Sequence, residues 1–264
     1  EAEDGGGSGR LDAVPGSGLG ALSDEEARVI RQSAERPALT RDVRAYLDQP
    51  EPLIITKSNA RSLVHRRAHM DYVGVKTFDA NGAFNGERRF VGLFTSSAYS
   101  LSSREIPLLR QKCAAVMTRA GFAPASHDGK ALAHILDTFP RDELFQISED
   151  ELLETAMGIL QLGGRPKVKL FLRFDRFDRF VSALVFAPRD HVNGELREKI
   201  HALLARALDG RKSASYPAID ESALVRIHYI IGRNRSPRPN VDIRGLEQQI
   251  ADAIKTWDDA FLEA

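Results

Sequence analysis

The chain has 264 residues, 42% of them apolar and 28% charged, the usual balance of a globular domain protein. Its 37 Lys and Arg residues balance 37 Asp and Glu residues, so net charge gives no attraction to nucleic acid or anionic membrane. Cys113 is the single cysteine, which excludes an internal disulfide and fits a reducing cytosol. No apolar run approaches the roughly 18 residues of a membrane span. We expect a cytoplasmic protein of two domains, with neither nucleic acid nor membrane as partner. The chain lacks an initiator Met, so we expect it to be a piece of something longer.

Residues 1–22 are rich in glycine and are predicted to form a flexible linker. The glycines of residues 16–20 invite comparison with a phosphate-binding loop. Such a loop follows a strand, however, and only polar sequence precedes these glycines. Ser23 and Glu26 have the spacing of a capping box, so ordered structure is expected to begin there. A second short helix is expected over residues 40–47.

Residues 23–122 are predicted to form a first small domain. Hydrophobic alternation predicts three antiparallel strands, over residues 52–58, 62–79 and 87–97. A capping box at Ser102 and Glu105 then precedes apolar residues at helical spacing from Ile106 to Ala120. This pattern predicts a helix able to cover the sheet.

Residues 123–165 are predicted to form a helical connector, with a further capping box at Ser148 and Glu151. Residues 166–264 form a second domain. It has two strands, a helix, a strand and a closing helix, over residues 167–174, 180–188, 194–210, 223–232 and 246–261. This order is close to a ferredoxin-like sandwich with its helices on one side. The predicted fold class is therefore α+β, with two small modules in which helices cover an antiparallel sheet.

Basic side chains recur along one predicted strand, at Lys57, Arg61, His65, Arg67 and His69. Because Arg grips carboxylates and phosphates in a fork, this strand could bind an amino acid or another small anion. The favoured alternative is a solvated face with ordinary ion pairs, for example to Glu87. His65 and His69 could share a metal, but Asp71 is the only carboxylate nearby, so no metal site is predicted.

No catalytic motif of high specificity occurs: there is no P-loop, G-x-S-x-G, H-E-x-x-H or paired C-x-x-C. Cys113 lies on an apolar helix face and is expected to be buried and inert. The loop at residues 233–238, RNRSPR, is expected to be solvated rather than a nucleic-acid patch. Phe171 gives only weak support for a sheet that stacks bases. No catalytic residue and no cofactor is therefore assigned to this chain.

The octet RFDRFDRF, residues 173–180, reads as the junction of two antiparallel strands. Phe174 and Phe180 belong to the strands, which leaves Phe177 as an aromatic residue at the hairpin tip. Exposed there, it would either fold back over the sheet or contact a partner surface, and we expect the contact.

The segments EPLIITKSNARSLVHRRAHMDYVGVKTFD and GERRFVGLFTSSAYSLSSREIPLLRQK resemble the N-terminal half of large bacterial NAD-specific glutamate dehydrogenases. The resemblance continues through SHDGKALAHILDTFPRDELFQIS and FVSALVFAPRDHVNGELREKI. It covers about residues 50–264. One departure lies at the hairpin, where the family pattern has Pro-Phe-Gly and this chain has Arg176, Phe177 and Asp178.

The resemblance implies a non-catalytic regulatory and oligomerisation segment built from ACT-like and PAS-like domains. NAD and the catalytic residues would belong to a downstream part of the full-length enzyme, and the partners would be its other domains and subunits in a homo-oligomer. An ACT-like domain is implied for residues 166–264, while residues 23–122 are ACT-like or PAS-like. The alternative is a stand-alone sensor of an amino acid or small anion.

Overall fold

The computed structural model describes residues 14, 16–23, 49–62, 64, 65, 68–163, 165, 167–219, 222–234 and 237–255. The contacts divide the chain into two compact units, residues 1–100 and 101–264. This division falls before the predicted domain limit at residue 122, and the predicted limits stay a prediction. Within the expected linker, Gly20–Leu22 forms the 3-10 turn η1. The predicted capping partner Glu26 and the helix over residues 40–47 lie outside the described residues.

The first unit contains a three-stranded antiparallel sheet in the order β1-β2-β3, formed by Leu53–Arg61, His69–Phe78 and Phe84–Gly92. The short helix α2, Ser97–Ser100, follows it. The predicted strand over residues 62–79 is too long, because β1 continues to Arg61 and a connection precedes β2. There the Ser62 N–H donates to the Ala68 carbonyl at 2.8 Å. In the turn between β2 and β3, the Asp79 carboxylate accepts the amides of Asn81 and Ala83.

The second unit begins with four helices, α3 (Leu109–Ala120), α4 (His127–Thr138), α5 (Arg141–Gln146) and α6 (Glu149–Leu162). The sequence predicted that α3 covers the first sheet, and the contacts group this helix with the second unit. The apolar face of α3, with Leu109, Cys113 and Val116, packs against α4 and α6. This packing accounts for the helical spacing of apolar residues in the sequence. The Ser102–Glu105 pair does not start this helix, and Ser102 instead donates to Asp137 of α4 at 2.9 Å.

Two caps hold these helices at their ends. The predicted capping box of α6 is confirmed, since Ser148 and Glu151 satisfy each other's backbone N–H. Lys112 of α3 extends to the C-terminal end of α5 and donates to the carbonyls of Leu144 and Ile147 at 2.9 and 2.7 Å. A cation at that end satisfies carbonyls that have no partner within the helix.

The rest of the second unit is an antiparallel sheet in the order β4-β5-β7-β6. Its elements are β4 (Lys169–Phe174), β5 (Phe180–Pro188), α7 (Gly194–Ala207), β6 (Gly210–Ala218), β7 (Leu224–Arg233) and α8 (Ile243–Ile254), with the short η3 (Arg189–His191) after β5. The spatial arrangement is that of the ferredoxin-like sheet, with the last strand of that fold moved to the front of the chain. The sequence did not reveal β6, because this edge strand is polar and contains Pro217, as edge strands often do.

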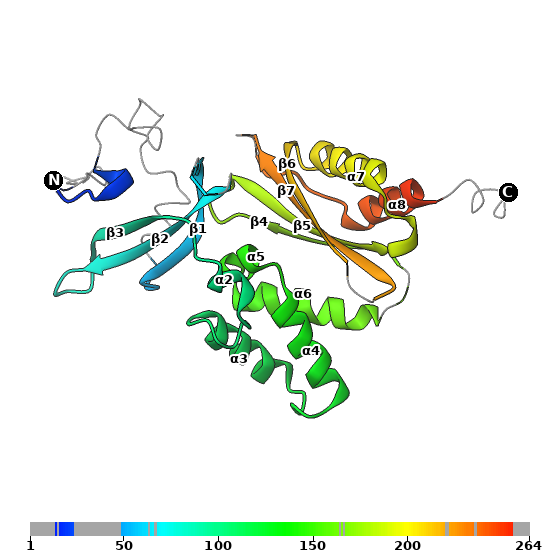
Figure 1. Cartoon of the computed structure of the whole chain (residues 1–264), viewed down its shortest axis with the longest axis horizontal. Coiled ribbons are helices and arrows are strands. Elements are labelled where there is room, and N and C mark those ends of the chain that lie inside the picture. The colour runs from blue at the N-terminus through cyan, green and yellow to red at the C-terminus, as the bar shows by residue number, and fades with distance from the viewer. Residues whose placement is uncertain are drawn as a thin grey trace, which may run out of the picture. The chain divides into compact units, whose positions relative to one another are not determined.

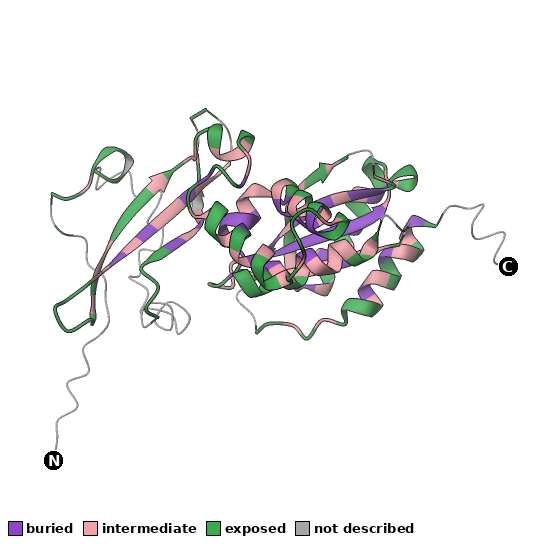
Figure 2. Cartoon of the chain, turned by 90° about the horizontal axis from the view of Figure 1, so that it is seen from below, coloured by how far each residue is buried: buried purple, intermediate pink, exposed green. Residues whose placement is uncertain are grey.

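Helices cover both faces of this sheet, whereas one covered face was predicted (Figure 1). On one face, α7 and α8 pack against β4, β5 and β7 around Ile200, Tyr229 and Ile250, which have no exposed surface. Buried residues run along the central strands (Figure 2). On the other face, the ring of Phe171 lies against α6 at Gly158, where an added Cβ would come within 2.6 Å of the ring. A glycine in the middle of α6 therefore serves close packing.

We predict that Gly158→Ala destabilises the second unit, although Ala is normally better than Gly in a helix by about 1 kcal/mol. The added methyl must displace the Phe171 ring. The matched control is Gly194→Ala in the first turn of α7, where the added Cβ meets no atom within 4 Å. This control should leave stability unchanged or raise it. Urea unfolding measures both, and equal effects of the two variants would contradict the packing role.

Candidate functional site

The residues of the predicted anion-binding strand do not lie on one strand. Lys57 and Arg61 belong to β1, His69 belongs to β2, and His65 lies in the connection between them. Lys57 of β1 pairs with the buried Asp71 of β2 at 2.6 Å, and Asp71 also accepts the Phe94 N–H at 2.7 Å. Arg61 donates from Nε to Nε2 of its cross-strand neighbour His69 at 3.3 Å. Asp71 thus ties three segments of the first unit together through Lys57 and the backbone.

His65 lies in the connection with φ at 64°, in the left-handed region, and its side chain is exposed. Arg67 lies outside the described residues. Glu87, the predicted ion-pair partner, pairs with Arg89 at 2.9 Å and accepts the Tyr72 hydroxyl at 2.7 Å. An anion site on this strand stays a prediction, and Lys57 would have to leave Asp71 to serve it.

The hairpin tip between β4 and β5 is closed by inward-facing carboxylates. Asp175 is buried and accepts the backbone N–H groups of Phe177 and Arg179 together with the Arg179 guanidinium. Asp178 stands where the family pattern has Gly, and it adopts the left-handed φ of 53° that Gly favours. Its carboxylate pairs with Arg233 at 3.4 Å and Arg238 at 3.2 Å. These charge pairs hold a non-glycine residue in that conformation.

Phe177 is half-buried rather than fully exposed, and the Arg179 guanidinium lies 5.4 Å from its ring centre. The expected solvation of the RNRSPR loop is wrong for Arg233. Its side chain has no exposed surface and donates to the Leu208 carbonyl at 2.7 Å. The polar sequence of this loop predicted that it is mobile. The fold instead brings Arg233 to two acceptors far away in the sequence, the Asp178 carboxylate of the hairpin and the Leu208 carbonyl.

The sheet face beneath α5 and α6 holds a buried polar cluster that the sequence did not reveal. Arg173 of β4 donates from both Nε and Nη2 to the Glu143 carboxylate of α5, the Nη2 bond being 2.9 Å, and both residues are buried. The Ser182 hydroxyl of β5 and Nε2 of His228 on β7 form a hydrogen bond of 2.8 Å. Both residues interact with Glu143 and favour its charged form. Polar side chains of three strands therefore gather at the carboxylate of α5.

Charge in this cluster is set by burial and pairing. Burial alone would raise the pKa of Glu143, but the charge and hydrogen bonds of Arg173 outweigh it and hold that pKa below its ordinary value. Burial lowers the pKa of His228, with Glu143 opposing in part, so its imidazole is neutral. Ser182, His228 and Glu143 resemble a nucleophile with its base, yet they are only 2%, 5% and 2% exposed. All three side chains are thus enclosed between helices and sheet.

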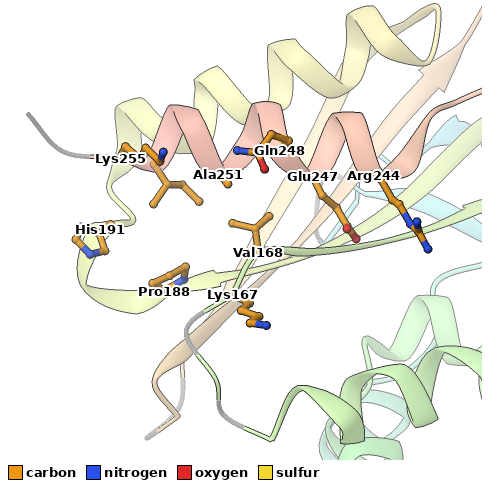
Figure 3. A pocket seen from close by; sticks show the side chains of 10 residues that line it. Lys167, Val168, Pro188, His191, Arg244, Glu247, Gln248, Ala251 and Lys255 are labelled. Carbon is orange, nitrogen blue, oxygen red and sulfur yellow. The ribbon is translucent and has the colours of Figure 1, made fainter. Parts of the chain in front are cut away.

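A shallow groove of about 450 Å³ runs between α8 and the ends of β4 and β5. Figure 3 shows Arg244 and Glu247 at one end of it and Lys255 and His191 at the other, with Lys167 across the groove from α8. Residues 244, 248 and 251 lie on one face of α8 at steps of four and three, and Lys255 follows four residues later as the C-cap of this helix.

Other predicted features have plain structural roles. Phe171 packs edge-on against Phe186 and lies against α6 at Gly158. Cys113 is buried, as expected, and burial raises the pKa of its thiol. In the part of the chain that the structure describes, no three His, Cys, Asp or Glu residues gather as a metal site would require. No described helix is long and apolar enough to cross a membrane.

The second unit belongs to a recognised class of domain. Residues 169–258 match the glutamate dehydrogenase ACT2 domain, which covers β4 through α8. Residues 106–165 match the glutamate dehydrogenase helical motif 1, which covers α3 through α6.

The chain belongs to the family of large NAD-specific glutamate dehydrogenases. It is 38% identical over 255 residues to the NAD-specific glutamate dehydrogenase of Halomonas elongata, covering 97% of this chain and 16% of that protein. It is 39% identical over 217 residues to the enzyme of that name from Pseudomonas aeruginosa, covering 82% of this chain and 13% of that protein. A relative of the same name from Mycobacterium tuberculosis is 27% identical over 260 residues, covering 94% and 15%. The chain thus spans about a sixth or less of the curated relatives it matches.

We predict that Glu143→Gln lowers the free energy of unfolding of the second unit by about 3–5 kcal/mol at pH 7, because Arg173 stays buried without its counter-charge. A carboxylate with a lowered pKa stabilises the fold above its unfolded pKa, and this contribution is lost as pH falls through the folded pKa. The difference between the variant and the unmodified protein should therefore shrink below about pH 4.5.

The control is Asp150→Asn, which breaks the exposed Arg119–Asp150 pair of α3 and α6 and should cost no more than about 1 kcal/mol. Urea unfolding across pH 3–8 measures both variants. A loss for Glu143→Gln as small as that of the control would show that the buried pair does not hold helices to sheet.

Proposed function

We propose that this chain is a non-catalytic regulatory and oligomerisation segment of a large NAD-dependent glutamate dehydrogenase. In this proposal the full-length cytoplasmic enzyme converts glutamate, NAD and water to 2-oxoglutarate, ammonia and NADH. Other parts of it bind NAD and perform the chemistry, and this segment contacts neighbouring domains and subunits of a homo-oligomer.

The observation that carries the proposal is the match to a helical motif and an ACT2 domain, together with a closed polar interior. The Ser182–His228 pair, which resembles catalytic machinery, is sealed between helices and sheet. The sequence also lacks a dinucleotide-binding fingerprint, which needs glycines between a strand and a helix. These features suit a module that transmits a regulatory signal or mediates assembly, rather than one that catalyses a reaction.

We predict that the purified chain forms no NADH from glutamate and NAD, measured by absorbance at saturating substrate. The control is the full-length enzyme at the same molar concentration, which should turn over. Sustained NADH formation by the chain alone, retained after a second purification step, would overturn the non-catalytic assignment.

We infer that Phe177 contributes to assembly of the full-length enzyme. The tip is braced from within by Asp175 and Asp178, so the half-buried ring is not needed to close the hairpin. A braced aromatic at a hairpin tip suits a contact between subunits or domains.

We predict that Phe177→Ser in the full-length enzyme shifts the oligomer distribution toward smaller species and changes its melting temperature little. The control is Tyr216→Ser, which removes a 60% exposed aromatic from β6 of the same sheet. Light scattering and thermal unfolding measure the two effects. A large fall in melting temperature with unchanged assembly would assign Phe177 to folding alone.

A further inference from the structure

One end of the second sheet gathers arginine from segments that are far apart in the sequence. Phe180 lies opposite Gly232 and Gly210 lies opposite Arg233, so the β4–β5 hairpin, the start of β6 and the end of β7 meet at this end. The chain as a whole has no net charge, yet six arginines and three aspartates, a formal charge of +3, lie within residues 175–179, 209–211 and 233–238. We call this surface the arginine end.

The aspartates of the hairpin face inward, and the arginines face outward. The side chains of Asp175 and Asp178 are only 3% and 21% exposed, whereas the side chain of Arg238 is 52% exposed. Arg176 at the tip and Arg211 on β6 are exposed as well. A partner that approaches this end therefore meets guanidinium groups rather than the carboxylates of the hairpin.

Contacts within the domain hold these guanidinium groups in place. The Arg238 guanidinium lies 5.4 Å from the centre of the Phe174 ring, within the range of a cation–π interaction. Nη1 of Arg211 donates to the Arg233 carbonyl at 3.2 Å. Side chains that are already ordered lose little conformational freedom on binding, so the arginine end is prepared for an anionic partner.

A guanidinium group binds carboxylates and phosphates alike, so other features must distinguish a protein partner from a nucleic acid. A nucleic acid presents a continuous row of phosphates, and the carboxylate of the exposed Asp209 would lie against that row. The neutral chain also lacks the net positive charge that supports binding to a polyanion. A protein segment can instead place single carboxylates at the arginines and an apolar side chain at Phe177.

We propose that the arginine end binds an acidic segment of a neighbouring subunit of the full-length enzyme. Carboxylates of that segment pair with Arg176, Arg211 and Arg238, and an apolar side chain of the same segment lies on Phe177. The inference deepens the proposed assembly role of Phe177 and rests on it for the identity of the partner. Binding of an acidic peptide to the purified chain can be measured independently of that role.

The first test is fluorescence anisotropy of a labelled hexaglutamate peptide with the purified chain at low salt. We expect saturable binding that weakens with added salt, because salt screens exposed charges. Arg176→Gln and Arg211→Gln should each weaken binding about threefold, and together about tenfold. The matched control, Arg110→Gln, removes an exposed arginine from α3 and should leave the affinity unchanged. Circular dichroism confirms that each variant is folded.

Three results of this titration would overturn the site. They are no binding of the peptide at low salt, equal weakening by Arg110→Gln and the variants of the arginine end, or tighter binding of a labelled oligothymidylate than of the peptide. The last result would assign the arginine end to single-stranded nucleic acid.

The second test is light scattering by the full-length enzyme that carries both Arg176→Gln and Arg211→Gln. We expect smaller species than for the Arg110→Gln enzyme at the same concentration. Unchanged assembly despite lost peptide binding would refute the neighbouring subunit as the occupant. Normal assembly of the Phe177→Ser enzyme would refute the role of Phe177 but not peptide binding by the arginines, so the two proposals fail separately.

Discussion

The buried ion pair between Glu143 and Arg173 is the constraint on which the second unit depends. Moving either charge out of water costs several kcal/mol, and only the partner and further hydrogen bonds repay this. Glu143 lies on α5 and Arg173 on β4, so the pair is satisfied only when the helices lie on the sheet. Ser182 and His228 lie buried beside the pair and form a hydrogen bond with each other, and burial lowers the pKa of His228.

This ion pair joins two segments that match separate family models, the helical motif 1 and the ACT2 domain. The helical motif covers one face of the ACT2 sheet while α7 and α8 cover the other, and Glu247 blocks an amide on the β4 edge. At the C-terminal end of β4, the Arg238 guanidinium lies 5.4 Å from the centre of the Phe174 ring.

Much of this second unit could be predicted from periodicity and capping. Strands β4, β5 and β7 fall where alternating or continuous apolar residues predicted them, and the Ser148–Glu151 box marks the start of α6. Prediction failed where the partner is far away in sequence. The edge strand β6 pairs with β7 through its backbone and needs few apolar side chains. Arg233 can be buried because the Asp178 carboxylate and the Leu208 carbonyl accept its hydrogen bonds. The groove beside α8 is missed for the same reason, since Lys167 and Arg244 are 77 residues apart.

The sequence by itself determined the α+β class, the start of α6 at its capping box, the burial of Cys113 and the resemblance to large NAD-specific glutamate dehydrogenases. These depend on local spacing and on residue order, which a single chain displays directly. Only the tertiary structure decided that α3 packs against α4 and α6, that both faces of the second sheet are covered, and that Glu143 meets Arg173. An apolar stripe on a helix must be buried, and a buried charged side chain must be paired. The sequence does not say against which surface or with which partner, because several surfaces of the same chain offer equivalent partners.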